Sequence, residues 1–332
     1  MDRAEQLRRW LDATLGGGEF GIAPASDDAS FRRYFRVRRG NAQAPLIAMD
    51  APPNKESCAQ FVRVAGLFAE AGVHVPAIHA QDLAQGFLLL SDLGDTTYLD
   101  ALDERNAETL YGHAFDALLR IQLASRTGVL PDYDRELLEK ELRLFPDWYV
   151  ARQLSRELAS TQAENLAKAF SAILENNLAQ PRVFVHRDYH SRNLMVSEPC
   201  PGILDFQDAV YGPITYDLVS LLRDAYIAWD EERVIDWAVR YWEKARGAKL
   251  PVAGDFADFY RDFEWMGAQR QIKILGIFAR LCFRDGKRGY LKDQPRVMEY
   301  LRRTCGRYRE LAGLARLLDE LDSTQNRVGY TF

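Results

Sequence analysis

The chain is poor in several features that mark particular protein classes. It has four cysteines, none of which forms a C-x-x-C pair or stands at zinc-ligand spacing from a histidine. The sequence therefore predicts isolated, reduced thiols rather than a disulfide framework or a zinc site. No apolar run approaches the length of a membrane span, and the charged N-terminus MDRAEQLRRWLDATLG lacks the apolar centre of a signal peptide. We expect a soluble, cytoplasmic protein with no membrane partner.

An excess of positive charge is also missing. The chain carries 43 Lys and Arg against 48 Asp and Glu, which gives a formal net charge of −5. Proteins that bind nucleic acids usually carry a basic surface, so we expect no nucleic-acid partner, although a local basic site is compatible with this balance. The sequence shows no internal repeat and does not indicate an oligomeric state. Its 332 residues are enough for two lobes.

Hydrophobic periodicity divides the chain into a strand-rich part and a helical part. The first part is expected to hold a short helix at 4–15, strands at 19–24, 31–38 and 45–50, a helix at 56–71 and two strands within 75–91. After the segment SDLGD, the expected elements are helices at 105–125, 135–158 and 162–178, a strand insert within 183–209, and further helices beyond Ile214.

This order of elements predicts an α+β fold. A small antiparallel β lobe with one helix would occupy residues 1–91, and a larger, mostly helical lobe would occupy residues 92–332.

The segment VFVHRDYHSRNLMV places a polar, charged centre between two apolar flanks. Its His186, Arg187 and Asp188, followed by Asn193, fit the pattern H-R-D-x-x-x-x-N, and Asp205 follows the short strand GIL twelve residues later. Phosphoryl transfer from ATP needs a carboxylate beside the acceptor hydroxyl and Mg²⁺ held by hard oxygen ligands. The pattern predicts that Asp188 supplies the first and that Asn193 and Asp205 supply the second. The alternative is a polar turn with an Asx cap.

These motifs resemble the protein-kinase-like fold in its aminoglycoside-phosphotransferase branch. More closely, HRDYHSRNLMV followed by GILDFQDAVYGPITYDLVSLLRD, with LIAMDAPP and QIKILGIFARL, is similar to the bacterial anomeric N-acetylmuramate/N-acetylglucosamine kinases. The resemblance covers nearly the whole chain. It implies a bilobal fold, in which residues 1–91 form a nucleotide-binding lobe that ends at a hinge, and residues 92–332 hold the catalytic loop, the metal site and the sugar-binding site. It also implies the cofactors ATP and Mg²⁺, and phosphorylation of the anomeric hydroxyl of N-acetylmuramate or N-acetylglucosamine, or both, in peptidoglycan recycling.

The resemblance also implies roles for individual residues. Asp188 would be the catalytic base, and Asp217 would support the catalytic loop from the start of a helix. The segment SDDASFRRYFRV would cover the phosphates, with nucleotide contacts from Ser30, Phe31, Arg32 and Arg33. The segment LLLSDLGD would be the hinge, and its backbone would pair with adenine at Leu89, Leu90 and Ser91.

Two features of the family pattern are absent. The phosphate turn has no glycine, so close approach of its backbone to phosphate is less free. The strand PLIAMD has no Lys, and Met49 or Asp50 stands where kinases carry the lysine that contacts the phosphates. Because strand residues alternate faces, we expect one of Arg32 and Arg33 to replace that lysine. The alternative is an exposed arginine pair.

The acceptor is indicated less directly. In RQIKILGIFARLCFRDGKR, the residues Arg270, Lys273, Arg280 and Arg284 lie on one side of an expected helix. A basic face suits a neutral or anionic sugar better than a polycationic aminoglycoside. The alternative is a solvated face that pairs with acidic neighbours such as Asp262 and Glu264. The candidate substrate contacts are Tyr189, Arg192, Arg270 and Lys273.

Three functional hypotheses follow. The first is an ATP- and Mg²⁺-dependent kinase of a small amino sugar. The second is a kinase of another hydroxyl acceptor, of the aminoglycoside, choline or homoserine type. The third is a catalytically inactive kinase-like scaffold, which the missing lysine favours. Only about ten residues join Asp205 to the next expected helix, which leaves no room for a peptide-docking loop and favours a small acceptor.

Overall fold

The computed structural model describes residues 2–26, 31–40 and 44–325, and the chain separates into two compact units. Unit 1 comprises Met1–Arg120 together with Arg192–Asp208, and unit 2 comprises Ile121–Ser191 together with Ala209–Phe332. The chain therefore passes from unit 2 to unit 1 inside the polar segment of the catalytic motif, and it returns after Asp208. A functional lobe boundary at residues 91/92 stays a prediction.

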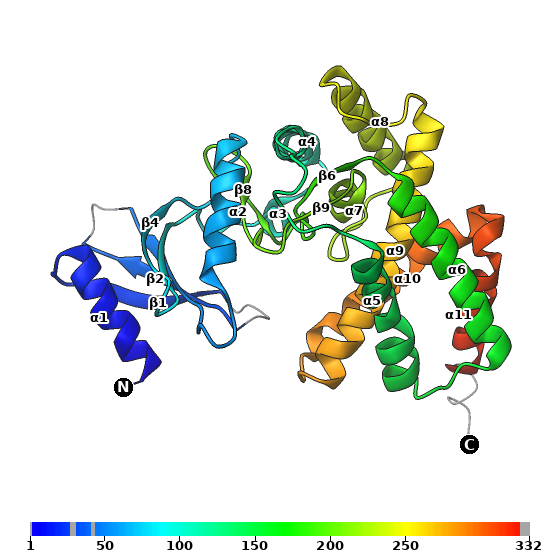
Figure 1. The fold of residues 1–332 in the computed structure, drawn as a ribbon, viewed down its shortest axis with the longest axis horizontal. Helices are drawn as coiled ribbons and strands as arrows, with labels where there is room; N and C mark the ends of the chain where they lie inside the picture. Colours follow the sequence, from blue (N-terminus) through cyan, green and yellow to red (C-terminus); the bar gives the residue numbers. More distant parts are fainter. Residues whose placement is uncertain (1, 27–30, 41–43, 326–332) are drawn as a thin grey trace. The chain divides into compact units, whose positions relative to one another are not determined.

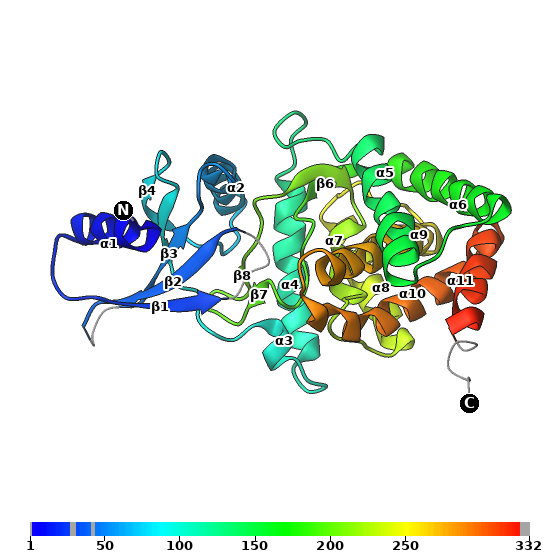
Figure 2. The same cartoon turned by 90° about the horizontal axis from the view of Figure 1, so that it is seen from below.

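Unit 1 is built on an antiparallel sheet of five strands in the order β1-β2-β3-β5-β4 (Figure 1). The strands are β1 (Gly21–Ser26), β2 (Arg33–Arg38), β3 (Leu46–Asp50), β4 (Ile78–Asp82) and β5 (Phe87–Ser91). The first helix, α1 (Arg3–Leu15), lies along this sheet (Figure 2). Its Leu7 and Leu11 are buried against the sheet residues Val37, Ala48 and Leu89, so one apolar stripe of the helix covers one face of the sheet.

The other helices of unit 1 include one that packs against the segment carrying Asn193 and Asp205. These helices are α2 (Cys58–Glu70), α3 (Tyr98–Ala101) and α4 (Ala107–Leu123), the last of which ends in unit 2. The ring of Phe206 packs against Phe61 and Phe68 of α2, at centroid distances of 4.8 and 5.9 Å. Beside it, β7 (Leu194–Met195) pairs with β8 (Gly202–Ile203). The packing of Phe206 on α2 therefore helps to fix the position of its chain neighbour, Asp205.

Unit 2 is mostly helical and holds one small strand pair, β6 (Arg182–Val185) with β9 (Val210–Pro213). Its long central helix is α9 (Phe256–Phe283), which packs against α5, α6, α7 and α10 (Figure 1). The other helices are α5 (Arg135–Leu144), α6 (Ser160–Ala179), α7 (Tyr216–Leu222), α8 (Glu231–Gly247), α10 (Gln294–Arg307) and α11 (Ala312–Gln325). Shorter turns are the π-helix η1 (Phe145–Gln153) and the 3₁₀ helices η2 (Arg288–Asp293) and η3 (Arg309–Leu311).

The predicted α+β class is confirmed, with one difference in the helical part. The helix expected over 135–158 stays α-helical only to Leu144 and continues as the π-helix η1. Pro146 stands near the start of η1 and has no amide hydrogen, so it cannot donate the bond that an α-helix requires there. No helix in the described ranges is both long and apolar enough to cross a membrane.

Candidate active site

The predicted catalytic loop follows β6 and is fixed by a buried carboxylate. Asp217, at the start of α7, accepts hydrogen bonds from the backbone N–H groups of His186 (2.7 Å) and Arg187 (3.0 Å). Burial raises the pKa of Asp217 to about 7, although these two bonds oppose the rise. Arg187 has φ +78°, a conformation that non-glycine residues adopt at a cost, and the bonds to Asp217 hold it there. The predicted support of the loop by Asp217 is confirmed.

Asp188 is partly exposed, and its backbone N–H donates to His186 Nδ1 at 3.2 Å. Loss of hydration would raise the pKa of Asp188, but nearby cations hold this pKa at about 2. The largest contribution comes from Lys273, and Arg270 and Arg187 also contribute. Asp188 is therefore ionised at neutral pH. A carboxylate of such low pKa is a weak base, and it is suited to orient a hydroxyl and to take its proton only as the new bond forms.

Asn193 and Asp205 lie side by side in unit 1, at the same end of the β7–β8 pair. Asn193 Nδ2 donates to Asp205 Oδ2 at 3.4 Å, and Gln207 Nε2 donates to Asp205 Oδ1 at 2.7 Å. The backbone bond from Leu204 N–H to Asn193 O (2.9 Å) fixes the spacing of the two positions. One amide oxygen and one carboxylate, both hard donors, fit a cation that keeps phosphate and water ligands, as Mg²⁺ does.

A closed metal cage is a different arrangement, and the structure gives it no support. Within residues 2–26, 31–40 and 44–325, no group of three or more His, Cys, Asp and Glu side chains is placed to hold a metal ion. The Asn193–Asp205 pair therefore resembles a site that the substrate's own phosphates complete, rather than a structural zinc site.

The two neighbouring arginines of the expected phosphate segment point to different partners, as strand alternation predicts. Arg32 is largely buried: it pairs with Glu56 (2.8 Å), and its NH1 lies 3.9 Å from Asp205 Oδ1. Arg33 is half exposed and pairs with Asp50. Arg32 is therefore the arginine beside the candidate metal ligand, and the alternative of an exposed arginine pair is wrong for it.

The strand that lacks the expected lysine, β3, ends in a carboxylate that has a structural role. Asp50 is fully buried at the end of β3 and accepts a hydrogen bond from Arg3 Nε at 2.7 Å as well as the bonds from Arg33. This carboxylate ties α1 to the sheet. Phe31 is 58% exposed, with Lys55 Nζ 4.2 Å from the centre of its ring. Ser30, also predicted to contact the nucleotide, lies outside the described residues.

The segment expected to form the hinge includes the end of β5. Leu89 and Leu90 are buried in β5, which pairs with β3 on one side and β4 on the other. The Ser91 N–H donates to Ala77 O (2.9 Å), and the Ala77 N–H donates to Ser91 Oγ (2.8 Å). The Ser91 N–H is therefore committed to Ala77, and adenine pairing along Leu89 to Ser91 stays a prediction.

The four candidate substrate contacts differ in exposure. Tyr189 is fully buried, and its ring packs edge-on against His186 at 5.6 Å, which leaves no ring face for a sugar. Arg192 is exposed and belongs to unit 1, where its charge lowers the pKa of Asp100 as the weakest of several causes, behind the hydrogen bonds from Thr97. The structure thus gives the stacking role of Tyr189 no support.

Arg270 and Lys273 are both buried, so the alternative of a solvated basic face is wrong for these two residues. Arg270 Nε donates to Ser220 Oγ at 2.5 Å, and Lys273 Nζ donates to Tyr216 Oη at 2.9 Å. Arg284, further along α9, is exposed and pairs with Asp285. The helix therefore presents two buried cations near Asp188 and an unrelated charge near its C-terminal end.

The acidic neighbours considered as partners of that face bind other groups. Glu264 pairs with Arg223 at 2.9 Å and also contacts Arg307, while Asp262 accepts from Asn176 Nδ2 at 2.6 Å. Burial raises the pKa of Asp262 to about 6. Neither carboxylate neutralises the pair of cations at Arg270 and Lys273.

Sequence reasoning missed Glu141, whose buried carboxylate contacts both Arg187 and Lys273. A signal was present in the sequence: Glu141 stands three residues after Leu138 and next to Leu142, on the apolar face of an amphipathic helix. A charged residue on such a face requires a buried partner. The partner itself could not be read from the sequence, because Lys273 is 132 positions away.

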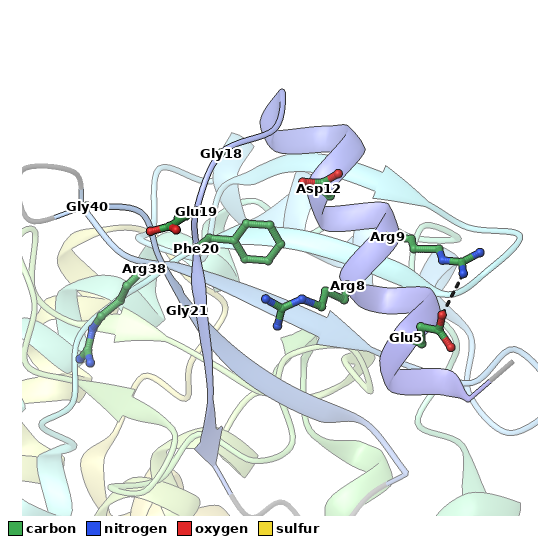
Figure 3. Close-up of a pocket in the computed structure, with 10 residues that line it drawn as sticks. All are labelled: Glu5, Arg8, Arg9, Asp12, Gly18, Glu19, Phe20, Gly21, Arg38 and Gly40. Atoms are coloured by element: carbon green, nitrogen blue, oxygen red, sulfur yellow. Dashed lines mark hydrogen bonds and ion pairs between the residues drawn. The ribbon is translucent and has the colours of Figure 1, made fainter.

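An open hollow of about 830 Å³ lies elsewhere in unit 1, between α1 and the start of β1 (Figure 3). Its side chains carry charges of both signs, and two of them, Arg9 and Glu5, already pair with each other at 2.8 Å. None of the predicted site residues lines it. The lining residues are Glu5, Arg8, Arg9, Asp12, Gly18, Glu19, Phe20, Gly21, Arg38 and Gly40. The chemistry described above gives this hollow no role.

Comparison with known proteins agrees with the motif and the fold. The family described as "Phosphotransferase enzyme family" matches residues 21–251. An N-acetylmuramate/N-acetylglucosamine kinase of Pseudomonas aeruginosa is 52% identical over 329 residues, which cover 96% of this chain and 97% of that protein. The protein of the same name from Neisseria meningitidis serogroup B is 48% identical, and the match covers 100% of both chains.

Solved structures agree at the level of the fold. Choline kinase from Cryptosporidium parvum superposes with a TM-score of 0.65 at 10% identity and covers 95% of this chain and 99% of that one. An ADP-bound aminoglycoside phosphotransferase gives 0.57 at 15% identity, with 89% and 96% covered. The predicted resemblance and the predicted kinase-like fold are both confirmed.

Proposed function

This chain belongs to the phosphotransferase enzyme family, and on that premise we propose that it transfers the γ-phosphoryl group of ATP to the anomeric hydroxyl of N-acetylmuramate or N-acetylglucosamine. The observation that carries the reaction type is the fixed, ionised Asp188 in the H-R-D-x-x-x-x-N loop. Full-length similarity to two kinases of that name supports the acceptor. A cytoplasmic role in peptidoglycan recycling fits such a reaction.

On the acceptor side, Asp188 would accept a hydrogen bond from the anomeric hydroxyl. This contact orients the hydroxyl oxygen towards the γ-phosphorus, and Asp188 takes the proton as the new O–P bond forms and the bond to the leaving ADP oxygen breaks. The buried cations Arg270 and Lys273 favour a neutral or anionic acceptor. They disfavour a polycationic aminoglycoside, because like charges near a desolvated site repel strongly.

On the nucleotide side, Asn193 and Asp205 would hold Mg²⁺. When bound, the cation neutralises the charge of the phosphate oxygens during transfer. The guanidinium of Arg32 lies beside this pair and would add a second positive charge. Arg32 would thus supply the positive charge of the missing strand lysine, whose absence is the argument for an inactive scaffold.

The proposal is tested by measuring ATP consumption with N-acetylmuramate, N-acetylglucosamine, glucose, galactose and an aminoglycoside, followed by NMR of the product. We expect turnover with the two amino sugars and phosphate on the anomeric carbon. Asp188→Asn should lower kcat by about 10²–10⁴-fold, since the general base is lost. The exposed Asp236→Asn, which breaks only a surface pair with Arg240, should leave kcat unchanged.

Two results would contradict this assignment. Near wild-type turnover by Asp188→Asn would remove the catalytic role of that residue. A phosphate on any hydroxyl other than the anomeric one would overturn the acceptor assignment and leave the phosphotransferase reaction in place.

A further inference from the structure

A carboxylate of unit 2 that lies outside the motif gathers the cations of the catalytic loop. Glu141 of α5 is 5% exposed, and its Oε1 lies 2.6 Å from Arg187 NH2 and 3.1 Å from Lys273 Nζ. Its Oε2 accepts from Gln269 Nε2 at 3.0 Å and from the hydroxyl of Tyr133. Four donors, two of them from α9 and the others from Tyr133 and Arg187, therefore converge on one buried carboxylate.

Two of these donors are cations, and placing them around a buried group is energetically unfavourable unless that group is an anion. Burial would raise the pKa of Glu141, but Lys273 and Arg187 outweigh burial and leave this pKa below its usual range. Glu141 is therefore an anion that neutralises the buried Lys273 and the partly buried Arg187. A buried charge is tolerated when it is paired and fully hydrogen-bonded, as this one is.

Both cations held by Glu141 adjoin the proposed base. Arg187 precedes Asp188 in the chain, and Lys273 is the neighbour that stabilises the charge of Asp188 most. Lys273 Nζ is fixed from a second side by Tyr216 Oη of α7, at 2.9 Å. Its position is thus set by α5 and α7 together rather than by its own flexible side chain.

We propose that Glu141 is a positioning residue of the acceptor site, which holds Lys273 and Arg187 in place beside Asp188. The inference rests on the proposed kinase function. Without Glu141, each cation would be drawn towards Asp188, which is the partly exposed carboxylate of the loop. A closer ion pair would turn Asp188 away from the acceptor hydroxyl and weaken it as a base.

The inference has a signature in pH dependence, because Lys273 titrates and Arg187 does not. Burial opposes the charge of Lys273, but neighbouring groups outweigh burial and raise the pKa of Lys273 above its usual value, and Glu141 contributes most to this rise. The groups that face Lys273 are Glu141, Tyr216, Arg187 and Asp188. Loss of the Glu141 charge therefore lowers the pKa of Lys273. In a Glu141→Gln variant, the activity should fall on the alkaline side at a lower pH than in the wild-type enzyme.

The experiment measures kcat/KM for the amino sugar as a function of pH. For Glu141→Gln we expect a fall of about 10–100-fold at neutral pH, an alkaline limb moved to lower pH, and a KM for ATP within about twofold of the wild type. Adding Lys273→Arg to this variant should return the alkaline limb to higher pH, because a guanidinium stays charged. A merely structural defect would lower activity equally at every pH.

Two further variants control for folding. Glu139→Gln changes the same residue type on the same helix, but the Glu139 side chain is partly exposed and pairs across the surface with Arg135, at 3.4 Å. It should leave kcat/KM and its pH profile unchanged. Glu141→Asp keeps the charge, so its alkaline limb should remain with that of the wild type even where turnover falls. A limb that moves as far as in Glu141→Gln would contradict the inference.

The possible failures are distinguishable. If the wild-type protein turns over an amino sugar, and folded Glu141→Gln shows the same kcat/KM and pH profile, the inference alone is wrong. If the wild-type protein phosphorylates no sugar at all, the proposed function fails and the inference fails with it.

Discussion

At the scale of single residues, environment separates side chains of the same type into different tasks. Asp188 and Asp217 both belong to unit 2, but surrounding cations hold the pKa of Asp188 at about 2 against the effect of desolvation, whereas burial raises that of Asp217 to about 7. The first is an ionised group with one side open to solvent, and the second is a buried acceptor for backbone N–H groups. The same contrast divides Arg32 from Arg33, which are neighbours with different partners.

We predict that Arg32, and not Arg33, contributes to nucleotide affinity. Arg32→Met should weaken the binding of MgATP by about 10–100-fold, because a charge-assisted hydrogen bond to phosphate is lost. Arg33→Met is the matched control and should change nucleotide affinity by less than about twofold, since its guanidinium is committed to Asp50. Isothermal titration calorimetry measures both. A larger loss for Arg33→Met than for Arg32→Met would reverse the assignment.

At the scale of elements, the site depends on how closely α9 packs against α5. The two helices bring Lys273 and Glu141 together, and Gly276 lies where α9 meets the end of α5. A Cβ atom at Gly276 would lie 2.4 Å from the carbonyl carbon of Leu144, which is backbone and cannot move aside alone. The absence of a side chain at Gly276 therefore permits the contact on which the Lys273–Glu141 pair depends.

We predict that Gly276→Ala lowers the free energy of unfolding by about 1–3 kcal/mol, because overpacking forces the helices apart. It should also lower kcat/KM for the sugar. Gly66→Ala, in the exposed interior of α2 with nothing within 4 Å of the new Cβ, should instead raise stability by about 0.5–1 kcal/mol. Urea denaturation measures both. Equal effects of the two substitutions would show that helix propensity, and not close approach, decides the outcome at Gly276.

At the scale of the whole molecule, the proposed base and the proposed metal ligands belong to different units of the chain. The proposed base Asp188 belongs to unit 2, and the proposed metal ligands Asn193 and Asp205 belong to unit 1, because the chain changes unit after Ser191. Substitutions at Asp188 and at Asp205 can therefore test the proposed base and the proposed metal site separately. A ligand that binds only the native state raises the melting temperature by mass action, so metal-dependent nucleotide binding should be visible without turnover.

We predict that ATP with Mg²⁺ raises the Tm of the wild-type protein more than ATP with EDTA does. Asp205→Ala should abolish the Mg²⁺-dependent part of this rise, because a metal ligand is lost. Asp188→Asn should keep it, because the proposed base does not bind the metal. A thermal-shift assay measures all three proteins. An Asp205→Ala variant with an unchanged Mg²⁺ effect would contradict its role as a ligand, and no rise with wild-type protein would favour the scaffold hypothesis.

The sequence alone determined the order of helices and strands, the α+β class and the family, because periodicity and motif spacing are local properties. The candidates Asp188, Asn193 and Asp205 came from a single stretch of about 20 residues. The local sequence pattern did not predict every element correctly. The change from α- to π-helix after Leu144 was not foreseen, although Pro146 was present in the sequence as a signal for it.

Only the tertiary structure decided which arginine lies beside Asp205, that Arg270 and Lys273 are buried, and that Glu141 joins the catalytic loop. The physical reason is distance along the chain. The Glu141–Lys273 contact joins residues 132 positions apart, and only the packing of α5 on α9 creates it. A sequence specifies which groups are present and how they are spaced locally, and packing selects the partners that set their charge and position.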